Sequence, residues 1–167
     1  MLELIPSEEQ KAEALLQAKD MGAVRNSIRK GKGNAIGFIG ELLVADALGV
    51  QPILNATKDY DLVLDCGTTI DVKTKETSVV PRGYYDCSVA ATSLHQDCDV
   101  YVFTRYSREA SKLGRSVLFV CGWLPHDEYF SVARELKKGE QDGDNGFIVK
   151  ADCFNVRIDQ LREGLPA

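Results

Sequence analysis

The sequence predicts an α/β fold in which a mixed central sheet is flanked by helices. Three observations carry this prediction. Two helical segments open the chain, an alternation of apolar and polar side chains begins at Tyr60, and two apolar runs rich in Val, Phe and Tyr follow. Alternation is typical of strands with one buried face, whereas continuous apolar runs are typical of strands covered on both faces. This order of elements favours helices packed on a mixed sheet.

The first helix is expected to begin after Ser7 and to end near Met21. Gln10 follows Ser7 at the spacing that lets each side chain cap the backbone amide of the other. A second helix is expected over residues 35–48, because Gly49 follows its last apolar residue and glycine commonly ends helices.

A β-hairpin is predicted over residues 60–75, with its turn at 66–68. The alternation on both sides of that turn has the period of two that strands require. The remaining elements are predicted in this order: a short helix over 86–95, strands over 99–106 and 116–123, a helix over 125–138, an exposed and mobile loop over 137–146, a strand over 147–158 and a helical turn over 159–163.

Composition excludes several classes of protein. The net charge of -5 argues against a protein that coats nucleic acid by bulk charge, although it leaves room for a local basic patch. Five cysteines without a C-x-x-C pair suggest neither a disulfide framework nor a zinc cluster, so we expect reduced thiols in a cytoplasmic protein. No secretory signal or long apolar run is present, so no membrane association is expected. No phosphate-binding glycine loop is present either, so no nucleotide cofactor is expected.

Charged side chains converge on one face of the predicted hairpin. Alternation places Asp61 on one face of the first strand, and Asp71, Lys73 and Lys75 on one face of the second. Buried charge is costly unless it is paired or bound to a metal. Carboxylate and carbonyl oxygens are the ligands that Mg²⁺ prefers, so the hairpin predicts a magnesium site.

A third carboxylate is expected from the second helix. Glu41 is the only charged residue in the apolar run 37–45. Gly37 and Gly40 lie on the same side of that helix, and their missing side chains would let the helix approach the sheet closely. We therefore expect Glu41 to lie beside the hairpin.

These residues resemble the active-site signature of the PD-(D/E)XK nuclease superfamily. The resemblance rests on Glu41 in a Gly-x-x-Gly-Glu helix, on Asp61 at a strand, and on the Asp-x-Lys segment Asp71–Lys73. It covers about residues 34–106 and implies a restriction-endonuclease-like core, a mixed central β-sheet between helices. One departure is Tyr60, which stands where the signature has proline.

The resemblance implies a metal-dependent phosphodiesterase that uses Mg²⁺, with Mn²⁺ able to substitute. Its catalytic set would be Glu41, Asp61, Asp71 and Lys73. Asp61, Asp71 and the backbone carbonyl of Val72 would ligate the cation, and Glu41 would bind it directly or through water. The cation would activate water and neutralise charge on the phosphate oxygens, while Lys73 would orient that water and stabilise the transition state.

DNA is the expected substrate of this site. Lys75 would contact an adjacent phosphate, and a basic segment ahead of the second helix would contact the DNA backbone. The basic residues of that segment are Arg25, Arg29, Lys30 and Lys32. A chain of 167 residues has little room for a separate module that reads sequence, which favours a structure- or end-directed endonuclease of recombination, repair or phage DNA processing. Junction resolution by a homodimer is one version of this function.

The chain is expected to form one nuclease-like domain over residues 1–167. Residues 1–33 would supply the N-terminal helix and the basic segment, residues 34–123 the catalytic core, and residues 124–167 the C-terminal helix, the mobile loop and the last strand.

The sequence is also compatible with other functions. The same fold would also suit a non-catalytic module that binds nucleic acid or protein, or an RNA-processing hydrolase with the same site. Asp59 is a rival to Asp61, and Asp65 is expected to form the hairpin turn. His95 and His126 lack a partner at ligand spacing and are placed outside the site.

Overall fold

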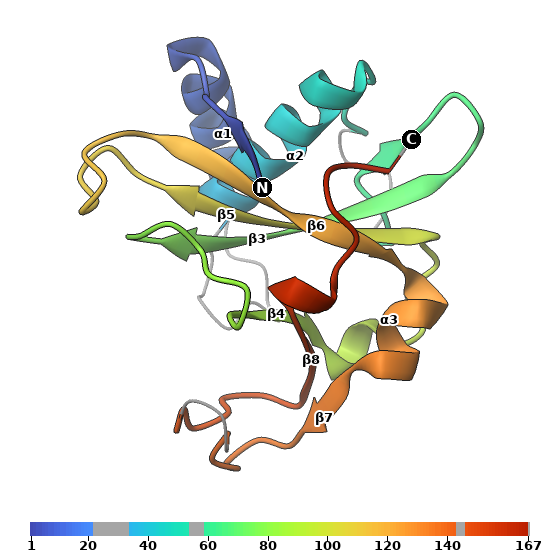
Figure 1. Cartoon of the computed structure of the whole chain (residues 1–167). Helices are drawn as coiled ribbons and strands as arrows, with labels where there is room; N and C mark the ends of the chain where they lie inside the picture. Colours follow the sequence, from blue (N-terminus) through green and yellow to red (C-terminus); the bar gives the residue numbers. More distant parts are fainter. Residues whose placement is uncertain (22–33, 54–58, 143–145, 167) are drawn as a thin grey trace.

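The computed structural model describes residues 1–21, 34–53, 59–142 and 146–166. Figure 1 shows three layers: helices α1 and α2 lie above a central sheet, and a second, smaller sheet lies below it with helix α3. The predicted class, a mixed α/β fold with a mixed central sheet and helices, is confirmed.

The central sheet has five strands in the order β1-β6-β5-β3-β2. Among these described strands, β3 and β5 pair in parallel, and the other neighbours are antiparallel. The strands are β1 (Leu2–Leu4), β2 (Leu62–Val63), β3 (Thr69–Thr77), β5 (Val100–Ser107) and β6 (Val117–Pro125). The predicted hairpin and the two predicted apolar strands are therefore confirmed, whereas β1, at the edge of the sheet, was not predicted.

The two long helices, α1 (Glu8–Met21) and α2 (Asn34–Leu48), cover one face of the central sheet. At the start of α1, Gln10 N donates to Ser7 Oγ at 3.1 Å and Ser7 N donates to Gln10 Oε1 at 2.9 Å, so the predicted reciprocal cap is confirmed. Gly49 follows α2 with φ of 71°, a conformation that favours glycine.

The apolar side of the hairpin packs under α2, as the alternation predicts. Leu62 and Ile70 are fully buried and join one core cluster with α2 residues such as Ile39 and Val44. Burial on this side is what holds the opposite side chains of the hairpin in a fixed orientation.

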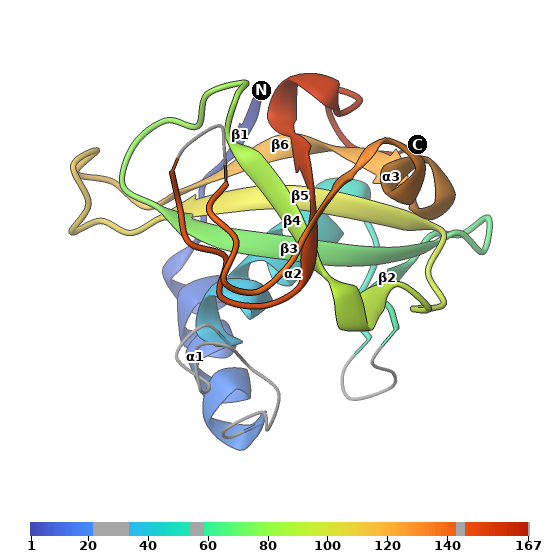
Figure 2. The ribbon, with the colours of Figure 1, turned by 90° about the horizontal axis from the view of Figure 1, so that it is seen from below.

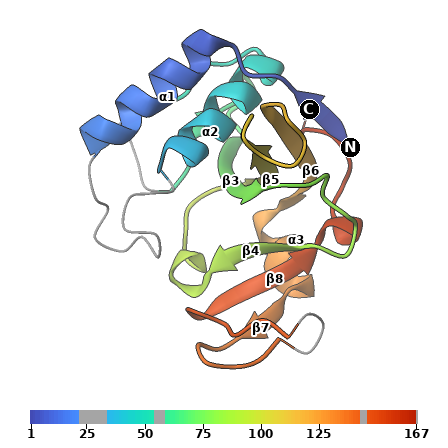
Figure 3. The ribbon, with the colours of Figure 1, turned by 90° about the vertical axis from the view of Figure 1, so that its left-hand side faces the viewer.

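The other face of the central sheet is covered by a second sheet of order β4-β8-β7 (Figure 2). Its elements and neighbours are β4 (Asp86–Ala90), the 3-10 turn η1 (Ala91–Ser93), α3 (His126–Val132), β7 (Arg134–Leu136), β8 (Cys153–Arg157) and the 3-10 turn η2 (Ile158–Gln160). Figure 3 shows this layer on the side of the central sheet away from α1 and α2. Tyr101 and Phe103 of the central sheet meet Tyr129 of α3 in a second core cluster.

The helix predicted over 86–95 is wrong. Residues 86–90 form strand β4, whose Cys87 and Val89 point into the second core while their neighbours lie partly exposed. This two-residue alternation is a strand pattern, and pairing with β8 outweighs the helical tendency of the segment.

The helix predicted over 125–138 is too long. It ends at Val132, and residues 134–136 become strand β7 because their backbone pairs with β8. Arg134 also holds Asp86 and Asp142 at 3.1 Å each, which fixes this segment against the second sheet.

The strand predicted over 147–158 is reduced to β8, Cys153–Arg157, and the predicted final turn appears as η2. The predicted loop over 137–146 lies partly outside the described residues. The five cysteines are free thiols, of which Cys87, Cys98 and Cys121 are buried. Within the described ranges, no helix is long and apolar enough to cross a membrane.

Candidate active site

The β2–β3 hairpin brings Asp61 and Asp71 to the same end of the central sheet. Asp61 lies directly before β2, and its backbone N donates to the carbonyl of Ile70 at 2.8 Å. Its carboxylate oxygen Oδ2 accepts a hydrogen bond of 2.7 Å from the backbone N of Val72. Backbone pairing therefore holds the Asp61 side chain beside the residue that follows Asp71.

Asp71 and Lys73 lie on the side of β3 that faces the second sheet. They pair in register with Tyr101 and Phe103 of β5, whose rings belong to the second core. Asp71 is only 5% exposed, and the Lys73 ammonium lies 2.5 Å from its Oδ2. Among the described residues, Oδ2 accepts no well-aligned hydrogen bond, so the Lys73 charge is the contact that compensates this buried oxygen.

Glu41 reaches the same region from helix α2 because the helix lies unusually close to β3. A Cβ atom at Gly40 would lie 1.9 Å from Oγ1 of Thr74 and 3.0 Å from its Cβ, so only glycine fits there without rearrangement. The predicted close approach of the helix is confirmed at Gly40. At Gly37 the space is wider, since a Cβ there would meet Glu41 Oε1 at 3.8 Å.

The three carboxyl groups influence one another electrostatically. Burial, together with the negative charges of Asp61 and Asp71, raises the pKa of Glu41 to about 8, while the charge of Lys73 opposes this rise. Burial and Asp71 likewise raise the pKa of Asp61 to about 7, against the hydrogen bond from Val72 and the charge of Lys73. A proton or a cation is therefore held more tightly here than at isolated carboxylates.

Gln96 is a site residue that the sequence did not reveal. Its amide Nε2 donates to Oδ1 of Asp71 at 2.9 Å and to the backbone carbonyl of Asp59 at 2.7 Å. The hydroxyl of Tyr101 donates to Gln96 Oε1 at 3.3 Å. An uncharged side chain just beyond the segment predicted as a helix gives no signal of such a role.

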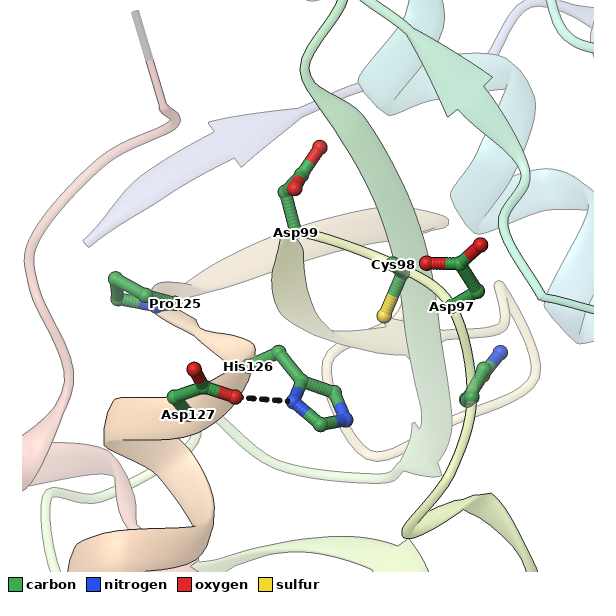
Figure 4. A pocket seen from close by; sticks show the side chains of 7 residues that line it. Asp97, Cys98, Asp99, Pro125, His126 and Asp127 are labelled. Atoms are coloured by element: carbon green, nitrogen blue, oxygen red, sulfur yellow. Dashed lines mark hydrogen bonds and ion pairs between the residues drawn. The ribbon is translucent and has the colours of Figure 1, made fainter.

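A pocket of about 340 Å³ opens next to Gln96 and is drawn in Figure 4. His126 lies on its wall, stacked on Tyr101 at 5.6 Å, and its Nδ1 lies 3.0 Å from Oδ1 of Asp127. In the described part of the chain, no partner reaches the buried Nε2 of His126. The pocket adjoins Asp71 through Gln96, and three of its seven lining residues, Asp97, Asp99 and Asp127, are acidic, which does not favour phosphate.

Lys75 is turned into the space between the two sheets. Its ammonium donates to Ser88 Oγ at 2.7 Å and to the carbonyl of Asp86 at 3.3 Å. Burial, and then the neighbouring charge of Arg105, lower its pKa. These contacts join β3 to β4, so Lys75 is not presented to an incoming phosphate, contrary to the expectation from its place in the sequence.

The structure describes some of the remaining residues singled out in the sequence and not others. The basic segment with Arg25, Arg29, Lys30 and Lys32 lies outside the described residues. Asp65 is exposed in the turn of the hairpin, as expected. Of the two rivals, Asp61 directs its carboxylate at β3, whereas Asp59 contributes its backbone carbonyl to Gln96.

The site as it stands is a group of mutually repelling carboxylates next to one lysine. Across the ranges that the structure describes, no three His, Cys, Asp or Glu side chains form a ready arrangement for a metal ion. No protein-family model matches the chain, and no curated protein is similar to it in sequence.

Proposed function

We propose that this chain is a Mg²⁺-dependent nuclease that hydrolyses phosphodiester bonds in DNA. One observation carries the proposal: three carboxyl groups from separate segments meet beside Lys73, where Asp61 and Asp71 raise the pKa of Glu41 and Asp71 raises that of Asp61. A lone structural ion pair would need only one carboxylate. Three carboxylates around one ammonium leave negative charge that a divalent cation would balance.

The donors suit a hard cation by their chemistry. Carboxylate oxygens are the ligands that Mg²⁺ and Mn²⁺ prefer, and the buried Oδ2 of Asp71 has the Lys73 ammonium as its compensating charge. Asp61, Asp71 and the carbonyl of Val72 would hold the cation, with Glu41 bound directly or through water. Because no three such side chains of the described residues stand ready as ligands, and Lys73 is paired with Oδ2, binding requires Lys73 to leave Oδ2 and the carboxylates to move together.

Each residue then has a role in hydrolysis. A bound Mg²⁺ would lower the pKa of a water molecule and neutralise charge on the phosphate oxygens. Asp61 and Asp71 would hold the cation in a fixed place relative to the hairpin, which is itself anchored by the buried Leu62 and Ile70. The Lys73 side chain is 30% exposed, so its ammonium can turn from Asp71 toward the phosphate and stabilise the negative transition state.

The fold supports a restriction-endonuclease-like core as part of this proposal. A mixed sheet carries the hairpin at one end, and α2 brings Glu41 to that end from one face. The opposite face carries a second sheet and the short helix α3, so helices supply only part of that cover. Within this proposal, the enzyme is a structure- or end-directed endonuclease.

The test is cleavage of a panel of labelled nucleic acids by purified protein. Linear, circular, single-stranded and four-way-junction DNA and a single-stranded RNA would be incubated with Mg²⁺, with Mn²⁺ or with EDTA. We expect cleavage of DNA that requires the metal and is lost in Asp71→Asn. Cleavage of RNA alone would identify an RNA-processing hydrolase, and binding without cleavage would identify a non-catalytic module.

A further inference from the structure

Gln96 connects two segments that carry the proposed cation ligands. Its Nε2 donates to the backbone carbonyl of Asp59, two residues before Asp61, and to the carboxylate of Asp71. One amide group therefore joins the chain entering β2 to the beginning of β3. This link is independent of the backbone pairing between Asp61 and Ile70.

The orientation of the Gln96 amide follows from its partners. A backbone carbonyl and a carboxylate both require a donor, so the NH₂ group faces Asp59 and Asp71. The opposite end of the amide, Oε1, faces the Tyr101 hydroxyl, which can donate. Tyr101 is fully buried, and its ring is packed between Phe103, Tyr129 and His126. A rigid aromatic core thus sets the position of the amide.

The two carboxylate oxygens of Asp71 have different partners. Oδ1 accepts from the neutral Gln96 amide, whereas Oδ2 faces the Lys73 ammonium. A hydrogen bond to Oδ1 fixes the rotation of the carboxylate, so that the same oxygen, Oδ2, always points toward Lys73. Hydrogen-bonded partners of this kind orient ligands and commonly change metal affinity when they are removed.

We infer that Gln96 is a positioning residue of the proposed cation site, which aims Oδ2 of Asp71 at the cation through its hydrogen bond to Oδ1. The inference rests on the proposed function, since it assigns Gln96 a role in the same site. Tyr101 supports this role from the core, and Gln96 itself does not touch the cation. Loss of the amide frees the Asp71 carboxylate to rotate, which weakens cation binding without removing any ligand.

The experiment measures binding of Mn²⁺ directly, by the electron paramagnetic resonance signal of the free ion, in wild type and in Gln96→Met. Methionine keeps the length of the side chain and removes its donors. We expect the dissociation constant for Mn²⁺ to rise about ten- to a hundredfold. Gln17→Met is the matched control, because Gln17 also donates to a carboxylate, that of Glu13 at 3.1 Å, on exposed α1. Its Mn²⁺ affinity should equal that of wild type.

A second measurement separates positioning from general structural damage. DNA cleavage by Gln96→Met would be measured as Mn²⁺ is raised to saturation. A positioning role predicts that saturating Mn²⁺ restores the maximal rate to near that of wild type, whereas structural damage would leave that rate low at every concentration. Thermal unfolding of each variant checks folding, and Gln96→Asn, whose shorter amide cannot span both acceptors, replaces Gln96→Met if that variant does not fold.

The outcomes separate this inference from the proposed function. Equal Mn²⁺ affinity in wild type and folded Gln96 variants would overturn the role of Gln96 and leave the nuclease proposal intact. A low maximal rate at saturating Mn²⁺ would overturn the positioning role as well. If wild type itself binds no Mn²⁺, the cation site is wrong and the inference falls with it.

Discussion

The ammonium of Lys73 lies 2.5 Å from Oδ2 of Asp71, on the same strand and the same face of the central sheet. The period of two in a strand places these side chains next to each other, and burial of Asp71 makes the pairing necessary. The carboxylate oxygen proposed to bind a cation is thus occupied by the lysine proposed to act on the phosphate. Cation binding and release of Lys73 are therefore one coupled event in this account.

The close approach of α2 to β3 predicts different effects at two neighbouring glycines. Gly40→Ala places a Cβ 1.9 Å from Thr74 Oγ1, so Thr74 or the helix must shift, and overpacking of this kind costs about 1–3 kcal/mol. Gly37→Ala meets only Glu41 Oε1 at 3.8 Å and should gain up to about 1 kcal/mol from helix propensity. Urea unfolding measures both, and equal stability of the two variants would contradict the packing described for Gly40.

The raised pKa values of Glu41 and Asp61 predict that stability falls as pH rises, when no divalent cation is present. Their ordinary values are 4.5 and 3.8, and in the folded protein they are about 8 and about 7. A carboxyl group whose pKa is raised by folding binds its proton more tightly in the folded state. Its contribution is fully present below about pH 4 and is lost as pH rises through 7 to 8.

Urea unfolding in EDTA at pH 5 and at pH 8 tests this prediction. We expect a lower free energy of unfolding at pH 8, by a few kcal/mol, and a partial recovery when Mg²⁺ is added at that pH. Glu41→Gln removes one of the charges and should flatten the dependence. Stability that stays constant or rises between pH 5 and pH 8 would show that these carboxylates do not repel one another as described.

The contacts of Lys75 predict that it does not contribute to DNA binding. Removal of a lysine that contacts a phosphate reduces the slope of log affinity against log salt concentration by about one. Lys75 instead donates to Ser88 and to the carbonyl of Asp86 between the sheets. Lys75→Met should therefore leave the salt dependence of DNA binding unchanged in a fluorescence titration without divalent cation. A slope reduced by about one would show that Lys75 contacts a phosphate of the DNA.

Local sequence patterns predicted the elements that position the candidate site. The period of two around Asp71 identified the hairpin and its buried side, and the glycine spacing before Glu41 identified the close approach of α2. Each of these features is set by residues near one another in the chain. For that reason they could be recognised without the tertiary structure.

The second sheet could not be predicted in the same way, because its strands depend on pairing between distant segments. Residues 86–90 and 134–136 are short segments, and both are completed as strands by pairing with β8 near the end of the chain. Gln96 was missed for a related reason. Its role depends on Asp59 and Asp71, which lie far from it in sequence. Glutamine also carries no charge, so its residue type does not indicate a site.

The most direct test of the central claim compares DNA cleavage by wild type, Asp71→Asn and Lys73→Met in Mg²⁺ at neutral pH, with Lys138→Met, an exposed lysine of the second-sheet layer, as control. We expect metal-dependent cleavage by wild type and by the control. Both site variants should fold and lose cleavage by a factor on the order of a hundred or more, since each removes transition-state stabilisation. Cleavage that survives in folded Asp71→Asn and Lys73→Met, or none by wild type, would contradict the account.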